Sequence, residues 1–214
     1  MRLPLRRWTI LAALSLGLPA RSALAQCTFI DTGIPADSSN ASGGVFLGEA
    51  LGQTFQAEGL QIESITVWRV PWQAGYVYGI HIYVVPTDSL GEPSVANMLL
   101  DGPTVFNAGG DGIHPTPFEF VFDPPLGLPR LGLYEFAVQS DPCGGIWDIL
   151  TVGGADYYPA GYAWVHSRST GLDCPLRGNP AGYPNADLCF RVRYCDIPTP
   201  IQKATWGHLK VIYR

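Results

Sequence analysis

Lysine is scarce in this chain of 214 residues. Only Lys203 and Lys210 are present, and charged residues make up 14% of the sequence. Acidic residues outnumber basic ones by 18 to 13, which gives a net charge of −5. An acidic surface repels nucleic-acid phosphates, so we do not expect nucleic acid as a partner.

The common catalytic motifs are also missing. The sequence contains no G-x-S-x-G elbow, no H-E-x-x-H helix motif and no phosphate-binding glycine loop before a helix. The four histidines are scattered, and none has a second histidine at the spacing of a metal site. We therefore expect a protein that is not an enzyme and that needs no organic cofactor.

Long apolar runs are absent after the first 25 residues, so we expect no transmembrane segment in the mature chain. The start of the chain has the features of an export signal: an arginine-rich beginning, an apolar run from Ile10 to Leu18 and Ala-Leu-Ala at 23–25. These features predict that residues 1–25 are a signal peptide cleaved before Gln26.

Residues 24–27 also resemble a lipoprotein box, but Gln26 just before Cys27 fits such a box badly. Ordinary export is the expectation, with the product secreted or held at the cell surface. After cleavage, 9 basic residues face 18 acidic ones, so the mature chain is more acidic still.

The chain has five cysteines and none forms a C-x-x-C pair, which favours disulfides over a metal site. We predict two bridges and one free thiol. The first bridge is expected between Cys27 and Cys195, where it would join the two ends of the domain. The second could be Cys143–Cys174 or Cys174–Cys189.

Alternation of apolar and polar residues predicts strands in most of the remaining chain. The 25 glycines and 19 prolines argue against long helices and supply turns. Nine strands are predicted at roughly 26–31, 52–57, 62–70, 77–85, 96–100, 116–122, 132–140, 161–168 and 187–195. The predicted fold class is all-β, a two-sheet antiparallel β-sandwich of the jelly-roll type. The domain is expected at 26–196, followed by a linker and tail at 197–214.

Several short motifs follow one another in an order known from one family. They are Leu51-Gly-Gln-Thr-Phe-Gln56, the strand Ile62–Val70, Ile80–Val84 with Gly91-Glu-Pro93, Leu131–Phe136 and Asp187–Val192. Together they resemble the secreted bacterial "choice-of-anchor" domains, β-sandwiches similar in shape to carbohydrate-binding modules. The resemblance covers about residues 45–195. It implies display at the cell surface and carries no catalytic residues over to this chain.

Aromatic side chains are the candidates for ligand binding. Trp72 and Tyr76 lie on either side of Gly75 in a predicted loop, and Tyr157 and Tyr158 form a second exposed candidate. Exposed rings suit a sugar ligand because the C–H face of a pyranose stacks on them, although core packing uses most aromatic residues of a sandwich.

Two more aromatic sets share a strand face. The first is His81 with Tyr83, and the second is Tyr162, Trp164 and His166. Each could line a ligand surface or form a half-buried face of the sandwich.

Carboxylates raise two further hypotheses. Asp111, in a glycine-rich loop, could hold a structural calcium ion, although loop aspartates often hydrogen-bond their own turn. Glu119 and Glu135 lie on consecutive predicted strands and could be the acid pair of a polysaccharide hydrolase. The alternative is that both are solvent-facing acids.

The tail, residues 203–214, has no acidic residue, and it contains the aromatic residues Trp206 and Tyr213. Trp206, Leu209 and Tyr213, with the terminal Arg214, predict a short signal that sorting machinery could read. The alternative is a terminus that folds back on the acidic domain.

These observations predict a secreted or surface-displayed, non-enzymatic domain for interaction or adhesion, with a glycan or another envelope component as its ligand. The alternatives are an extracellular polysaccharide hydrolase and a structural subunit of the envelope or an appendage.

Overall fold

The computed structural model describes residues 27–32, 42–45, 49–71, 78–107, 109–141, 147–153, 157–166 and 180–195. All of them belong to one compact unit, Ala25–Thr199. The predicted signal peptide, the tail with Trp206, Leu209, Tyr213 and Arg214, the rings of Trp72 and Tyr76, and Cys143 and Cys174 lie outside the described residues. The predicted domain boundaries stay predictions.

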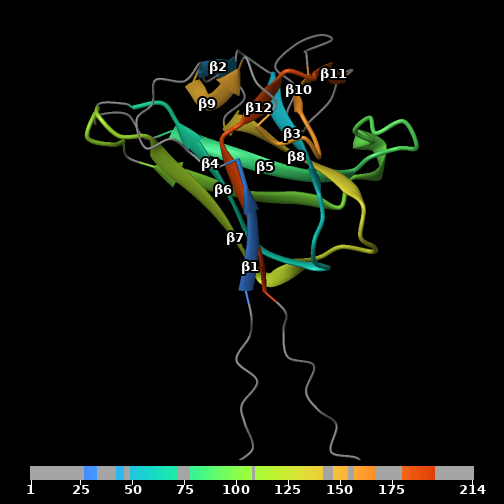
Figure 1. The fold of residues 1–214 in the computed structure, drawn as a ribbon. Coiled ribbons are helices and arrows are strands. Elements are labelled where there is room, and N and C mark those ends of the chain that lie inside the picture. The colour runs from blue at the N-terminus through green and yellow to red at the C-terminus, as the bar shows by residue number, and fades with distance from the viewer. Residues whose placement is uncertain are drawn as a thin grey trace, which may run out of the picture. The chain divides into compact units, whose positions relative to one another are not determined.

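The described strands form two antiparallel sheets (Figure 1). One has seven strands: β1 (Cys27–Asp31), β13 (Phe190–Cys195), β4 (Gln61–Arg69), β9 (Trp147–Gly153) and β12 (Ala186–Leu188) in that order, with β2 (Ser42–Val45) paired to β9 and β7 (Thr116–Gly127) paired to β4. The other has six: β11 (Pro180–Tyr183), β10 (Ala163–His166), β3 (Ala50–Gln56), β8 (Leu133–Asp141), β5 (Tyr78–Pro86) and β6 (Leu100–Asn107). The predicted all-β, two-sheet antiparallel architecture is confirmed.

Period-two alternation places one face of each sheet in a shared core. On β7, Phe118, Phe120 and Phe122 are buried, whereas the residues between them are exposed. The rings of Phe136, from the six-stranded sheet, and Phe190, from the seven-stranded sheet, lie 5.5 Å apart. Each buried phenylalanine stabilises the fold by roughly 1.5–3 kcal/mol, so this interface between the sheets is the main source of stability.

The six-stranded sheet is buried on its other face too. Ala50, Tyr83, Val85 and Ala137 form a second apolar cluster there. Val95 and Met98, in and beside the short 3₁₀ helix η1 (Val95–Asn97), pack against it. Strand β8 is consequently buried on both sides along most of its length.

The strand predicted at 96–100 is wrong. Residues 95–97 form η1, and the strand follows at Leu100–Asn107. Gly102 and Pro103 disfavour a strand in general, but β6 is an edge strand, where a proline removes no hydrogen bond that the sheet needs. The region predicted as one strand at 187–195 consists of β12 and β13, which belong to the same sheet and are separated at Cys189.

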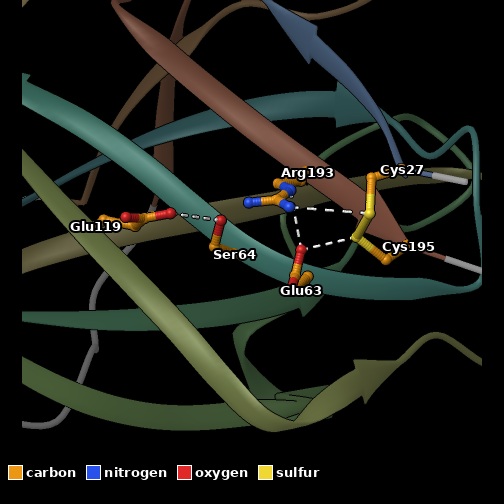
Figure 2. Close-up of a disulfide and its surroundings, with 6 residues drawn as sticks. All are labelled: Cys27, Glu63, Ser64, Glu119, Arg193 and Cys195. Carbon is orange, nitrogen blue, oxygen red and sulfur yellow. Dashed lines mark hydrogen bonds and ion pairs between the residues drawn. A yellow bond between two sulfur atoms is a disulfide. The ribbon is translucent and has the colours of Figure 1, made fainter. Parts of the chain in front are cut away.

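The predicted bridge between Cys27 and Cys195 is confirmed. The two residues face each other in the pairing of β1 with β13, and their Cα atoms lie 4.1 Å apart (Figure 2). Cys189 is a buried free thiol, so the alternative Cys174–Cys189 bridge is not formed. Within the described ranges, no helix has the length and apolar character needed to cross a bilayer.

Candidate functional site

Strand β4 forms the floor of an open groove on the outer face of the seven-stranded sheet. Thr66 of β4 faces Glu119 of β7 on one side and Arg191 of β13 on the other. Two residues earlier on β4, Ser64 is likewise flanked by Val121 of β7 and Arg193 of β13. These positions alternate with core residues, so their side chains point away from the core.

The groove has a volume of about 530 Å³. It is lined by Ser64, Thr66, Trp68, Pro117, Glu119, Arg191 and Arg193. Ser64 and Thr66 have short side chains and are only 4% and 8% exposed, so they lie at the bottom of the groove between the longer side chains of β7 and β13. Trp68 and Pro117, which face each other in the sheet, give the groove an apolar end.

One wall of the groove carries a hydrogen-bond acceptor. The Oγ of Ser64 donates to Oε1 of Glu119 at 3.0 Å, as Figure 2 shows. This bond orients the exposed carboxylate of Glu119 over the floor.

The other wall carries donors held in place by acids and rings. The Nε and Nη2 atoms of Arg191 donate to Oδ2 of Asp31 at 3.1 and 2.9 Å. The same guanidinium lies 4.9 Å from the ring centre of Phe29 and 5.9 Å from that of Trp68. Cation–π contacts of this kind fix the plane of the guanidinium and add to its attraction for Asp31.

Arg193 is held at the disulfide end of the same wall (Figure 2). Its Nε lies 2.9 Å from Oε2 of Glu63, and its Nη2 lies 3.9 Å from Sγ of Cys27. Oε2 of Glu63 also lies 2.7 Å from Sγ of Cys195. Because a disulfide sulfur has no hydrogen to donate, this last contact is not a hydrogen bond, and the two bonded cysteines with Glu63 cannot act together as thiolate metal ligands.

A further acid–base contact, between Glu135 and His166, is buried inside the molecule. Oε1 of Glu135 lies 2.7 Å from Nε2 of His166, and both side chains are fully buried. Burial raises the pKa of Glu135, and the neighbouring His166 partly opposes that shift. Oε2 of Glu135 and Nδ1 of His166 are buried and have no hydrogen-bond partner among the described residues.

This arrangement overturns the hypothesis of a paired-carboxylate hydrolase. Glu119 lies on the outer face of the seven-stranded sheet. Glu135 lies on β8 of the six-stranded sheet, and its side chain is fully buried. The sequence could not show this, because consecutive strands β7 and β8 belong to different sheets. Two carboxylates so placed cannot flank one glycosidic bond.

The two aromatic sets on predicted strand faces are largely buried. Tyr83, Trp164 and His166 are each 3% exposed or less. Tyr162 stacks on Trp164 with ring centres 5.0 Å apart, and His81 hydrogen-bonds to Thr104. They form a packed face of the sandwich and not an open ligand surface.

The predicted ring pair at 157–158 is divided by the fold. Tyr157 is exposed, whereas Tyr158 is half-buried with its ring edge against Phe190, 5.2 Å away. The buried carboxylate of Asp187 accepts from the backbone N–H groups of both residues. A binding role for either ring stays a prediction.

The carboxylate of Asp111 is engaged by its own turn. Oδ1 accepts from the backbone N–H groups of Ile113 and His114, each at 2.8 Å, and Oδ2 contacts Nδ1 of His114. These hydrogen bonds hold the pKa of Asp111 well below its usual value. The bonding is that of a turn-forming aspartate, and a calcium ion there stays a prediction.

Apart from Glu119, which was a candidate catalytic acid, the groove residues were not predicted as a site. Trp68 and Arg191 are far apart in the sequence, and only the antiparallel pairing of β4 with β13 brings them together. The one available signal was the alternation of Arg191 and Arg193 with buried residues, which places both guanidinium groups on a single face.

The fold and the groove together define an antiparallel β-sandwich with an open, polar surface site on one sheet. No family model and no curated protein matches the sequence. Among solved structures, the chain is similar to the cysteine protease and lectin-like domains of Cwp84, described as a surface layer associated protein of Clostridium difficile, with a TM-score of 0.45 and 9% identity. The match covers 71% of this chain and 35% of that one, so the chain spans about a third of the length of that protein.

Proposed function

We propose that this protein is a secreted or surface-displayed interaction domain that binds a glycan in the groove above β4. The chain acts on its ligand by binding and not by catalysis. The observation that carries the proposal is the groove itself, in which an exposed carboxylate and two fixed guanidinium groups face each other over a floor of hydroxyl groups. The features of an export signal and the resemblance of the sequence motifs to the "choice-of-anchor" domains support this location.

The groove supplies the three contacts that a sugar requires. Trp68 and Pro117 offer an apolar surface for the C–H face of a pyranose. Glu119 accepts hydrogen bonds from sugar hydroxyls, and Arg191 and Arg193 donate to them.

The donor wall is organised before any ligand arrives. Asp31 and Phe29 on β1 hold Arg191 in one orientation, so binding costs little side-chain entropy at this position. A site built on adjacent strands also keeps its spacing better than a site on loops.

Binding of the mature chain, residues 26–214, to a glycan array followed by calorimetry on the best oligosaccharide tests the proposal. Glu119→Ala and Arg191→Ala should each weaken binding about tenfold or more, because each removes a hydrogen bond to a charged group. Leu90→Ala is the matched control: this side chain is 80% exposed and does not line the groove, so affinity should not change.

The rings predicted from sequence provide a second arm. A Trp72→Ala/Tyr76→Ala variant tests whether those side chains take part. Loss of binding in that variant alone, with Glu119→Ala and Arg191→Ala unaffected, would move the site away from the groove. Failure to bind any glycan would remove the proposal.

The proposed location has its own test. Fractionation of the native cells should find the full-length protein outside the cytoplasm or at the surface. If the tail carries a sorting signal, deletion of 197–214 should change that distribution, and an unchanged distribution would remove the sorting role of Trp206, Leu209, Tyr213 and Arg214.

A further inference from the structure

We infer that the ligand of the groove is an uncharged, hydroxyl-rich glycan chain lying along β4, and that acidic polysaccharides are rejected. The inference rests on the proposed function and narrows it to one chemical class. It follows from the way in which opposite charges are divided between the two walls.

The walls stand on the two neighbours of β4. Glu119 projects from β7 and Arg191 from β13, and both face Thr66. Two strand spacings of about 4.8 Å separate the strands, so the walls rise roughly 9.6 Å apart at their base. A ligand lying on Thr66 is therefore close to both walls at once.

Only a ligand that donates hydrogen bonds on one side and accepts them on the other suits both walls. A sugar hydroxyl beside Glu119 donates to the carboxylate, and a hydroxyl on the opposite side of the ring accepts from Arg191. A carboxylate or sulfate could accept from Arg191 but would be repelled by Glu119. An ammonium group would have the opposite difficulty.

The charges of the groove also disfavour an anion. Arg191 is already paired with Asp31, and Arg193 with Glu63. Glu119 hydrogen-bonds to the neutral Ser64, and among the described residues no cation forms a salt bridge with it. The five charged groups therefore leave one net negative charge, on a protein that is acidic as a whole.

The remaining N–H groups of the two arginines stay available to neutral acceptors. Arg191 uses Nε and Nη2 toward Asp31, and Arg193 uses Nε toward Glu63 and Nη2 toward Sγ of Cys27. The guanidinium groups thus act here as fixed hydrogen-bond donors whose charge is largely balanced by their partners.

Calorimetry with two sets of oligosaccharides tests the inference. One set contains neutral oligomers of glucose, xylose and mannose, and the other contains uronic acid and sulfated oligomers, each measured at low and at high sodium chloride. We expect binding by at least one neutral oligomer with an affinity that does not change with salt, and no binding by the acidic set. Salt insensitivity is expected because screening acts on charge–charge attraction and a neutral ligand offers none.

Glu119→Gln is the decisive variant because it keeps the size of the side chain and removes its charge. Affinity for the neutral oligomer should fall about tenfold. Acidic oligomers should gain measurable binding, since the repulsive wall is gone. Arg191→Lys, which keeps the charge but loses the planar fork, should also weaken neutral binding. Both side chains are solvent-exposed, and a circular dichroism melt confirms that the variants are folded.

The outcomes separate the two proposals. Salt-sensitive binding of an acidic glycan, lost in Arg191→Ala, would overturn the inference and leave glycan binding in the groove intact. Binding of neutral oligomers that is unchanged in both Glu119→Gln and Arg191→Lys would overturn the assignment to the groove. Absence of binding by both sets would overturn the proposed function as well.

Discussion

Glu135 and His166 meet across a strand that belongs to neither of them. Glu135 lies on β8 and His166 on β10, and β3 runs between these two strands. The carboxylate reaches the imidazole by crossing β3 at Gly52, where an added Cβ would collide with Oε1 of Glu135. The missing side chain at position 52 is therefore what allows this buried contact.

Gly52→Ala should destabilise the protein by about 1–3 kcal/mol, the usual cost of an overpacked interior. The new methyl group must displace the Glu135 side chain, and the hydrogen bond to His166 is lost with it. Urea denaturation of the mature chain measures the change in the free energy of unfolding.

Gly132→Ala is the matched control for that substitution. An added Cβ at Gly132 meets nothing within 4 Å, and the residue has no positive φ. It should leave stability unchanged or raise it slightly, because alanine restricts the unfolded chain. Equal effects of the two substitutions would contradict the steric role of Gly52.

The buried Glu135 should make stability fall as pH rises. Burial raises its pKa in the folded protein, and His166 opposes the shift without cancelling it. The folded state therefore holds the proton more tightly than the unfolded state, whose pKa lies near 4.5. By linkage, the stabilising contribution is complete below that value and is lost as pH rises through the folded pKa.

Urea denaturation at a series of pH values checks this dependence against Glu135→Gln, which does not titrate at 135. Between the unfolded and folded pKa values, the wild type should lose stability relative to the variant. A rise of wild-type stability over the same interval would mean that the pair is stabilised in its charged form instead.

The fold was predictable because its signal is local. The alternation of Phe118, Phe120 and Phe122 with outward residues sets the face of β7 without reference to any other segment. Strand β8, which is buried on both faces, gave a weaker signal because Glu135 and Gln139 occupy positions that look solvent-facing in the sequence. Their burial depends on what packs over the sheet.

The groove was not predictable because it depends on register. Ser64 and Thr66 become a floor only when β7 and β13 pair on either side of β4, and a shift of one residue would turn the arginines into the core. The pairing of Cys27 with Cys195 could be predicted, since both lie at the ends of the strand-rich region.

Removal of the Cys27–Cys195 bridge should lower the free energy of unfolding by roughly 2–5 kcal/mol, the usual range for a native disulfide. The bridge closes a loop with a sequence separation of 168 residues and so restricts the unfolded chain strongly. A Cys27→Ser/Cys195→Ser variant, compared with wild type in urea under non-reducing conditions, measures the loss.

The same variant should also bind its ligand more weakly. Among the described strands, β13 is the only one that pairs with β1, and β1 carries the Phe29 and Asp31 side chains that orient Arg191. If β1 becomes mobile without the bridge, Arg191 loses the contacts that fix its orientation in the groove. Unchanged affinity at unchanged stability would show that β1 stays in place without its bridge.

The Cys189 thiol should not react in the native protein. Burial, together with the negative charge of nearby Asp187, raises its pKa to about 12, so almost no thiolate exists near neutral pH. Alkylation with iodoacetamide should label no cysteine in the folded, oxidised chain and one cysteine after denaturation in urea without reductant.

Peptide mapping should place that label on Cys189. It should also find Cys143 joined to Cys174, which is the second bridge that the sequence allows once Cys189 is free. Three labelled cysteines would contradict the second bridge, and labelling of Cys189 in the native state would contradict its burial.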